Sequence, residues 1–292
     1  MNTLRPWIQL ARPEQWIKNI LLFAPLIFGE RLFEGGILFQ SFFAFLLFSL
    51  AGSGIYILND ICDVKEDQNH PIKQHRPLAC GTIPIKKAKI LMGILLILSI
   101  VSSLILNEKF TIIIIFYIVT NILYSFFLKK IVIIDVMVLS LNYVMRVIAG
   151  TVAIDVPLTH WLLVLTIFLS LFLGLSKRRH ELTTLGITAH EHRASLKEYS
   201  PYFLDQMIAV VTASTVCLYS IYTLDATIIA RYKTSLLPFT IPFVLYGIFR
   251  YLYLIHQKNT GGNPTNTLLN DKPLLIDIAL WGLSVILIIY FF

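Results

Sequence analysis

Charged side chains are scarce in this chain of 292 residues. Asp, Glu, Lys and Arg together make up 14% of it, whereas hydrophobic residues make up 57%. The mean hydropathy of +0.75 lies far above the value of an ordinary water-soluble domain. We therefore interpret the chain as an integral membrane protein and exclude a water-soluble one.

Cysteine and the familiar catalytic motifs are also sparse. Cys62, Cys80 and Cys217 form no C-x-x-C pair, and we expect them to be free thiols. No G-x-S-x-G elbow, H-E-x-x-H pair or P-loop occurs in the sequence. The sequence thus carries no signature of a serine hydrolase, a zinc protease or a P-loop NTPase.

Long apolar runs, in contrast, are frequent. A helix needs about 20 mostly apolar residues to cross the hydrocarbon core of a bilayer. Nine runs of suitable length occur, at Trp16 to Phe33, Ile37 to Leu58, Ala88 to Leu106, Phe110 to Leu128, Ile131 to Ala153, Pro157 to Leu175, Phe203 to Leu224, Leu236 to Ile255 and Leu274 to Phe292. We expect an all-α membrane protein with nine transmembrane helices, built as one polytopic domain over residues 1–292.

The basic residues indicate how the chain is oriented. With the N-terminus in the cytoplasm, 18 of the 24 Lys and Arg lie on the cytoplasmic side and only Arg31, Lys109, Arg231 and Lys233 lie on the other. This asymmetry follows the positive-inside rule. It predicts an inner (cytoplasmic) membrane protein whose polar loops, 59–87 and 176–202, are cytoplasmic. The net charge of +7 then belongs mainly to one face, where it suits lipid headgroups and phosphate substrates better than nucleic acid.

An acidic strip follows the second apolar run. Asp60, Asp63 and Asp67 are spaced i, i+3 and i+7, with Asn59 beside them, so a continuing helix projects them from one face. Like charges repel each other there, and a divalent cation removes that cost. Oxygen ligands of this kind suit Mg²⁺, which fills its other positions with water and substrate phosphates. The alternative is a solvated helix end whose polar side chains only cap and hydrate the loop.

A polar stripe also runs through the fifth apolar run. Asp135, Asn142 and Arg146 return to nearly the same direction at 100° per residue. Ionisable groups within a span usually line an interior cavity, although bonding to a neighbouring helix is the structural alternative. Asp135 and Arg146 are three turns apart, so we expect no direct pair between them.

Further polar and basic groups lie at the cytoplasmic ends of other runs. They are Lys18 and Asn19, Lys73 and Arg76, Asn121 to Lys129, and "SKRRHE" from Ser176 to Glu181. Lys130 is better explained as a positive-inside anchor. A metal and carboxylate site surrounded by Lys and Arg is what a diphosphate leaving group requires, because both kinds of cation neutralise the charge that it develops.

Several short motifs occur in order along nearly the whole chain. They are "RPEQWIKN", "NDICDVKED", "RPLACGTI", "YSFFLKKIVIIDV", "YVMRVIAG", "SKRRHEL" and the tail "GGNPTNTLLNDKPL". In these motifs the sequence resembles the UbiA superfamily of intramembrane prenyltransferases, and within it the decaprenyl-phosphate phosphoribosyltransferase branch. The resemblance implies a UbiA-type bundle with a central cavity open to the cytoplasmic side, capped by the loops 59–87 and 176–202.

One departure separates the branches of this superfamily. Prenyl-diphosphate users carry a second aspartate-rich motif after the sixth span, whereas this chain has Lys177, Arg178 and Arg179 there. Basic residues suit more anionic ligands. The resemblance implies Mg²⁺-dependent transfer of 5-phosphoribose from phosphoribosyl diphosphate (PRPP) to a polyprenyl phosphate, with release of diphosphate, for synthesis of cell-envelope glycan precursors.

The resemblance, together with charge, also implies residue roles. Mg²⁺ and the donor are expected on Asn59, Asp60, Asp63 and Asp67. Lys18, Arg76 and Lys129 are expected to contact phosphates, with Lys129 acting beside Asp60 and Asp63 in catalysis. Tyr124 and Asp135 are expected to shape the donor pocket, and the 5-phosphate or the lipid phosphate is expected on Arg146, Lys177, Arg178 and Arg179.

Two rival functions stay open at this point. An ordinary prenyltransferase shares the fold and the first acidic motif, but the missing second motif counts against it. A lipid or solute transporter accounts for charged residues inside the spans, yet the sequence lacks the paired broken helices expected at a midplane site. The oligomeric state is also open, a homo-oligomer included.

Overall fold

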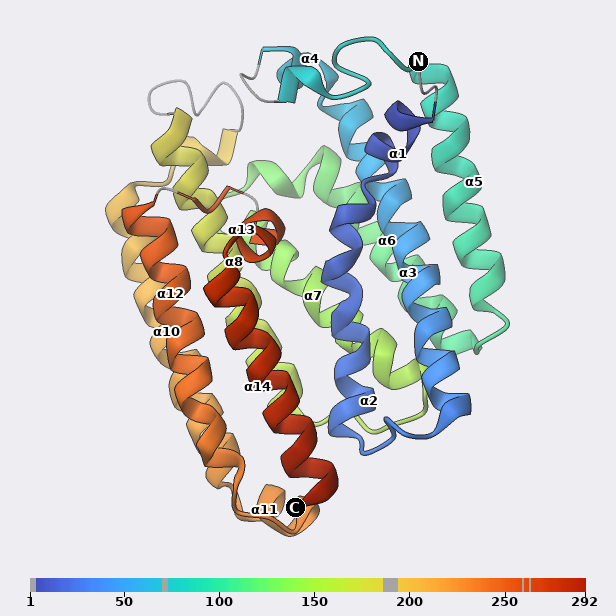
Figure 1. Cartoon of the computed structure of the whole chain (residues 1–292). Coiled ribbons are helices and arrows are strands. Elements are labelled where there is room, and N and C mark those ends of the chain that lie inside the picture. The colour runs from blue at the N-terminus through green and yellow to red at the C-terminus, as the bar shows by residue number, and fades with distance from the viewer. Residues whose placement is uncertain (1–3, 70–72, 186–193, 259, 263) are drawn as a thin grey trace.

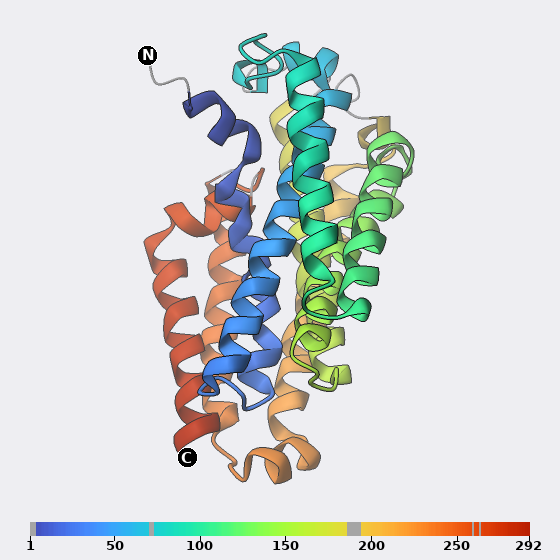
Figure 2. The same ribbon diagram turned by 90° about the vertical axis from the view of Figure 1, so that its right-hand side faces the viewer.

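The computed structural model describes residues 4–69, 73–185, 194–258, 260–262 and 264–292, and within these ranges it contains helices and turns but no strand. The long helices run side by side between two ends of the molecule (Figures 1 and 2). The N-terminus lies at one end and the C-terminus at the other. The all-α prediction is therefore confirmed.

Seven helices are long and apolar enough to cross a membrane. They are α3 (Gly35–Cys62), α6 (Glu108–Phe126), α7 (Ile134–Ala153), α8 (His160–Leu185, candidate span His160–Thr184), α10 (Pro201–Leu224), α12 (Ile241–Gln257, with the preceding 3-10 turn η6, Leu237–Thr240) and α14 (Lys272–Phe291). The protein is a multi-pass membrane protein. Each of these helices coincides with one of the nine apolar runs of the sequence.

The two other apolar runs also form helices, but these helices are not among the seven candidate spans. The first is divided between a 3-10 helix, η1 (Pro13–Phe23), and the short α2 (Ala24–Phe28), with a proline near the start of each. The second is α5 (Ile85–Ser103), which begins with Lys86, Lys87 and Lys89. Both η1 and α5 pack along α3. The two termini lie at opposite ends of the molecule, which agrees with a chain that crosses the membrane an odd number of times. The count of nine stays a prediction.

Short elements complete the two ends. Near the N-terminus lie α1 (Arg5–Ala11), α4 (Val64–Gln68) and the 3-10 turn η2 (Lys73–His75). The remaining connections contain η3 (Leu128–Lys130), η5 (Ala194–Lys197), α11 (Ala226–Tyr232) and α13 (Pro264–Asn270). The end that carries α4 and the N-terminus is the end to which the acidic strip belongs (Figure 1).

Side-chain caps set where several helices begin. Asn107, Ser200 and Asp271 each accept a hydrogen bond from a main-chain N–H three residues later, at 2.7, 3.1 and 2.9 Å. Such caps satisfy donors that the first helical turn leaves without a partner. Proline follows Ser200 directly, at the first position of α10, where its missing N–H costs nothing.

A glycine allows η1 and α7 to approach closely. A Cβ atom at Gly150 would overlap the main-chain carbonyl of Leu22 in η1. Backbone contact of this kind is typical of small residues at helix interfaces in membranes. It brings α7 against η1, so that polar side chains of the two helices can meet.

One exposed side of α5 is a stripe of large apolar residues. Ile90, Ile94, Ile97 and Val101 are all more than half exposed, at 63, 56, 64 and 59%. Their spacing returns to the same helix face every turn or two. In water such a stripe is costly, whereas against hydrocarbon it is not, which agrees with a membrane setting for this helix.

Candidate functional site

The acidic strip lies where α3 ends. The helix continues to Cys62, so Asn59 and Asp60 stand on its last turn rather than in a loop. Asp63 caps α3 and also precedes α4, whose Asp67 N–H donates to the Asp63 carbonyl at 2.8 Å. The nearly helical path keeps the acids close, but the break at Asp63 turns their side chains in two directions.

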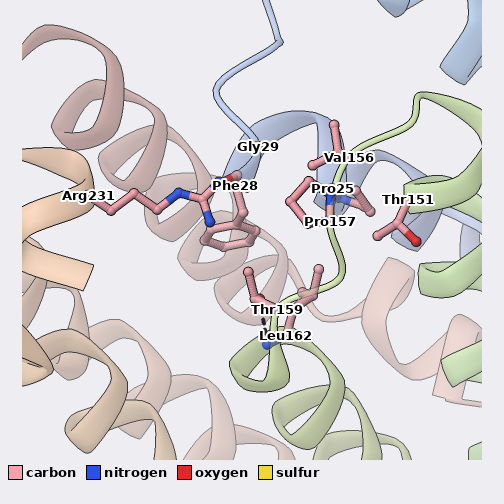
Figure 3. Close-up of a pocket in the computed structure, with 9 residues that line it drawn as sticks. All are labelled: Pro25, Phe28, Gly29, Thr151, Val156, Pro157, Thr159, Leu162 and Arg231. Carbon is pink, nitrogen blue, oxygen red and sulfur yellow. Dashed lines mark hydrogen bonds between the residues drawn. The ribbon is translucent and has the colours of Figure 1, made fainter. Parts of the chain in front are cut away.

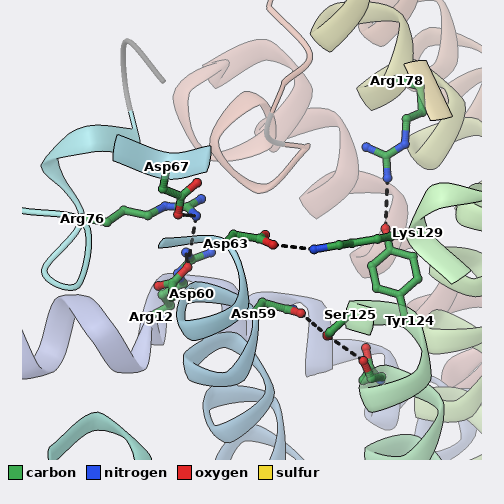
Figure 4. A network of polar contacts seen from close by, with 11 residues as sticks. Arg12, Asn59, Asp60, Asp63, Asp67, Arg76, Tyr124, Ser125, Lys129 and Arg178 are labelled. Carbon is green, nitrogen blue, oxygen red and sulfur yellow. Dashed lines mark hydrogen bonds and ion pairs between the residues drawn. The ribbon is translucent and has the colours of Figure 1, made fainter. Parts of the chain in front are cut away.

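Asp60 and Asp67 point toward the same arginine (Figure 4). The Arg76 Nη1 atom lies 3.1 Å from Asp60 Oδ1 and 2.5 Å from Asp67 Oδ2. Arg12 forms a second ion pair with Asp60. Both carboxylates are buried, at 2 and 3% exposure, and these cations offset part of the cost of removing two negative charges from water.

Arg12 reaches Asp60 because of an unusual backbone conformation. Its φ of 51° and ψ of 57° place it in the left-handed region, where it ends α1 ahead of Pro13. The chain therefore turns sharply into η1 at the level of the acidic strip. The sequence analysis missed Arg12 as a site residue, since nothing in its spacing indicates a partner 48 positions away.

Asp63 and Asn59 face the end of α6. Asp63 forms an ion pair with Lys129 of η3, and Asn59 accepts a hydrogen bond from Ser125 (Figure 4). The structure thus brings together Asn59, Asp63 and Lys129, and their roles in catalysis and metal binding stay predictions. Acids and bases of this cluster balance: Asp60, Asp63 and Asp67 are matched by Arg12, Arg76 and Lys129.

A fully buried ion pair lies between α7 and α8. Arg178 Nε donates to Asp135 Oδ2 at 2.6 Å, and neither side chain is exposed. The same guanidinium donates to Glu181 at 2.5 Å and to the Tyr124 hydroxyl at 3.1 Å. The resemblance implied that Arg178 is one of four candidates to bind the 5-phosphate or the lipid phosphate, and that role stays a prediction. In the structure Arg178 is buried between two carboxylates, where it holds Tyr124 in place.

Two residues of the segment after α8 complete this pair. The Tyr199 hydroxyl donates to Asp135 Oδ1 at 2.8 Å, and Ser195 Oγ donates to Asp135 Oδ2 at 3.2 Å. Asp135 therefore accepts from at least three described donors, and its side chain is fully buried. Neither Tyr199 nor Ser195 was singled out from the sequence, because an isolated Tyr or Ser in a polar segment carries no periodic signal.

Arg146 lies deeper in the bundle and is 4% exposed. It donates to Asn19 Oδ1 at 2.7 Å and to the Asn142 carbonyl, and its guanidinium carbon is 5.4 Å from the Phe48 and Tyr117 ring centroids. It forms no pair with Asp135, as expected. This set of contacts ties α7 to η1, α3 and α6, and it agrees with the structural alternative considered for Arg146.

The remaining basic residues of the predicted site are dispersed. Lys18 Nζ lies 3.4 Å from the Tyr56 hydroxyl, next to the Arg146 region. Lys177 is 4.0 Å from Glu181, one turn further along α8. Arg179 turns to α10, where it binds Asp205 at 2.5 Å. Part of the loop that was predicted to cap the site, 186–193, lies outside the described residues, as does 70–72 of the other loop.

Burial changes the titration of two groups at this end. It raises the pKa of Asp67 above its usual range, although Arg76 acts in the opposite direction. Burial also lowers the pKa of Lys73, and the largest opposing effect is that of the Glu181 carboxylate on α8. Lys73 thus links the two predicted capping segments electrostatically. A phosphate ligand would favour its charged form.

The donor set suits Mg²⁺ in its chemistry. Among the described residues, no three His, Cys, Asp or Glu side chains stand together as a ready cluster. However, oxygens of Asp60 and Asp67 contact one Arg76 nitrogen, so a positive group already lies between them. Carboxylate and amide oxygens are the ligands that Mg²⁺ prefers. A metal ion there requires Arg76 to move away from the two carboxylates.

A shallow pocket at the opposite end of the molecule is distinct from this site (Figure 3). It has an empty volume of about 210 Å³ and lies between Pro25, Val156 and Arg231, among others. Arg231 donates to the Phe28 carbonyl at 3.1 Å and lies 3.5 Å from Glu30. Its charge is therefore matched locally, and the described lining contains no acid–base pair suited to chemistry.

Comparison with known proteins agrees with this arrangement. Residues 22–270 match the UbiA prenyltransferase family. The chain is 34% identical to a decaprenyl-phosphate phosphoribosyltransferase of Mycolicibacterium smegmatis, over 99% of this chain and 94% of that protein. It is 31% identical to a protein of the same name from Corynebacterium glutamicum, over 97% of this chain and 86% of that protein.

A solved structure agrees at the level of the fold. A UbiA homolog from Archaeoglobus fulgidus, bound to DMAPP and Mg²⁺, superposes with a TM-score of 0.74 at 20% identity, covering 98% of this chain and 99% of that one. The helical arrangement is thus shared at low identity. Since the family match extends over most of the chain, this protein belongs to the UbiA prenyltransferase family.

Proposed function

We propose that this protein transfers 5-phosphoribose from PRPP to a polyprenyl phosphate of the decaprenyl type and releases diphosphate. The observation that carries the proposal is the 34% identity to a decaprenyl-phosphate phosphoribosyltransferase over nearly the full length of both proteins. The site is consistent with it. Acids and cations stand at one end of the bundle, and the segment after the sixth predicted span is basic where prenyl-diphosphate users are acidic.

Mg²⁺ belongs to this proposal as the cofactor. Asn59, Asp60, Asp63 and Asp67 would hold it, and when bound it neutralises charge on the departing diphosphate. A UbiA homolog of the same fold is bound to Mg²⁺, which supports the choice of metal. The four residues therefore act by binding and orienting the charged end of the donor.

The cations around the acids have a second task in this proposal. Arg76 and Lys129 are paired with carboxylates in the structure, and the donor phosphates would compete for them. Their positive charges would then lie beside the bond between the sugar and the departing diphosphate. There they would stabilise the negative charge that develops in the transition state. Lys18 would extend the basic lining along η1. The candidates for the 5-phosphate or the lipid phosphate are Arg146, Lys177, Arg178 and Arg179.

The acceptor explains why no general base is needed. A phosphate monoester is already anionic at neutral pH, so its oxygen can attack the anomeric carbon without first losing a proton to the protein. The protein must instead hold two anions close together and align them. Tyr124, held by Arg178 at 3.1 Å, and Asp135 behind it shape the donor side of the site.

The membrane setting completes the proposal. The chain crosses the inner membrane nine times as one domain, with the N-terminus and the acidic end in the cytoplasm, where PRPP is found. The segments 59–87 and 176–202 cap a central cavity that opens to that side. The acceptor enters from the bilayer, leaves its isoprenoid tail along apolar helix faces and presents its phosphate at the interface.

The direct test compares two donors with the purified protein. Labelled PRPP and a labelled prenyl diphosphate are each incubated with Mg²⁺ and decaprenyl phosphate or an aromatic acceptor, and the extracted lipids are analysed by mass spectrometry. We expect a phosphoribosylated lipid from the first mixture only. Turnover of the prenyl diphosphate alone would assign the protein to the prenyltransferase chemistry of its family instead.

A further inference from the structure

The connection between α6 and α7 contains a strained turn. Ile133 has φ 68° and ψ −49°, and the Ile134 N–H donates to the Val132 carbonyl across it at 2.8 Å. These values define a γ-turn of the rare positive-φ form. A β-branched residue at positive φ is a real outlier, because its side chain crowds the backbone there. Such strain persists only where surrounding contacts hold it.

The hydroxyl group of Tyr199, from another segment of the chain, is hydrogen-bonded to this turn. The Ile133 N–H donates to the Tyr199 hydroxyl at 2.7 Å, and the same hydroxyl donates to Asp135 Oδ1 at 2.8 Å. Tyr199 therefore bonds to the centre of the turn and to the first turn of α7 at once. Its own position is secured by burial at 5% exposure and by stacking on Phe203, with ring centroids 6.2 Å apart.

The turn matters because of what precedes it. Lys129 lies in η3, four residues before Ile133, and the main-chain bonds from Lys130 to Phe127 and from Ile131 to Leu128 make this stretch compact. Lys129 forms its ion pair with Asp63 from there. Relaxation of Ile133 toward negative φ would rotate the chain on one side of it, and the Lys129 ammonium group would move relative to the acids.

We infer that Tyr199 is a positioning residue, whose hydroxyl keeps the strained Ile133 turn in place and thereby sets Lys129 against the acidic strip. This inference rests on the proposed function for its effect on turnover. It adds a residue from the segment after α8 to an acidic strip whose other partners are Arg12, Arg76 and Lys129.

The protonation of Tyr199 suits this role. Burial, followed by the adjacent Asp135 carboxylate, raises the pKa of its hydroxyl well above the usual range. The group thus keeps its proton at neutral pH and can donate to Asp135 while it accepts from Ile133. Phenylalanine at this position removes both bonds but keeps the ring and its stacking. The substitution Tyr199→Phe is therefore the smallest change that releases the turn.

The test uses a rescue that a merely structural role would not produce. We expect Tyr199→Phe to lower turnover roughly ten- to a hundredfold, the size of effect that a small misplacement of a catalytic group has. Ile133→Gly in the same chain should restore most of it, because glycine adopts positive φ without strain. Ile133 is 50% exposed, so this second change removes little buried contact. Tyr202→Phe, at a 75% exposed tyrosine, is the matched control.

A second readout does not depend on enzyme activity. Hydrogen–deuterium exchange of peptides covering residues 128–136 should be faster in Tyr199→Phe than in the unchanged protein and in Tyr202→Phe. Unchanged exchange there, or a Tyr199→Phe variant that glycine at 133 does not rescue, overturns the inference. If exchange rises but no phosphoribosyl transfer is found in any variant, the proposed function fails and the role of Tyr199 in the turn stands.

Discussion

Arg178 and Asp135 form an ion pair in which Arg178 Nε lies 2.6 Å from Asp135 Oδ2, and neither side chain is exposed to solvent. Each alone would be a buried charge of high cost. Together, with Tyr199 and Ser195 on the carboxylate and Tyr124 and Glu181 on the guanidinium, they join α6, α7, α8 and the segment that follows α8.

Arg178→Met should destabilise the protein by about 3–5 kcal/mol, because it leaves the Asp135 carboxylate buried without its cation. Arg178→Met combined with Asp135→Asn should recover part of that loss, since the remaining amide is neutral. Thermal unfolding of the variants in the same detergent measures both. Equal losses in the single and the double variant would mean that the pair contributes through packing alone.

Lys129→Met should reduce phosphoribosyl transfer by roughly a hundredfold, the usual effect of removing one group that stabilises charge in the transition state. The neighbouring Lys130→Met is the matched control, because Lys130 is exposed and lies beyond the ion pair with Asp63. Initial rates with labelled PRPP are compared. A similar loss in both variants would point to membrane anchoring instead of a role at the site.

Asp60→Asn and Asp63→Asn should each abolish turnover while the protein still folds, since an amide keeps the shape but loses the charge that attracts Mg²⁺. Asp155→Asn at the opposite end serves as the control. Asp155 is exposed and has φ 52°, a conformation that asparagine tolerates well. Normal rates in either site variant would remove the acids from the mechanism.

Removal of divalent metal should stop the reaction, and added Mg²⁺ should restore it. Asp67→Asn should raise the Mg²⁺ concentration that gives half-maximal rate, because it deletes one carboxylate from the strip. Rates are measured over a Mg²⁺ titration after treatment with a chelator. Full activity in the chelator would contradict a metal-dependent reaction.

Gly150→Ala should destabilise the bundle by about 1–3 kcal/mol, the usual cost of overpacking, because the new methyl group would overlap the Leu22 carbonyl. It should also weaken the contact between Arg146 and Asn19, which needs η1 and α7 close together. Gly282→Ala in α14 is the control, since nothing lies within 4 Å of the added atom. Thermal unfolding distinguishes the two variants.

Much of the architecture could be predicted because the bilayer imposes one strong rule. Within hydrocarbon every main-chain polar group must be bonded inside its own segment, so an apolar run of sufficient length becomes a helix. Runs such as Leu274 to Phe292 accordingly coincide with α14. The run from Trp16 to Phe33 was harder, because it changes from a 3-10 to an α-helical part next to Pro25.

For the candidate site, the sequence predicted that the acidic residues lie near one another, but it did not predict their partners. Spacing placed Asp60, Asp63 and Asp67 on one helix face, but the break at Asp63 sends its side chain to Lys129 while the other two share Arg76. Arg178, one of four candidates for a phosphate, lies buried on Asp135. Helical periodicity describes neighbours within one helix, and these partners come from different helices.

By itself the sequence determined that the chain spans a membrane, where its helices lie and which end carries the acids and bases, because hydrophobicity, helix length and charge are local properties. Only the tertiary structure decided the partners: Arg12 with Asp60, Lys129 with Asp63, and Tyr199 on the strained turn at Ile133. Those contacts join residues 48 and, in the last two cases, 66 positions apart. They depend on how helices pack, and no local pattern specifies that.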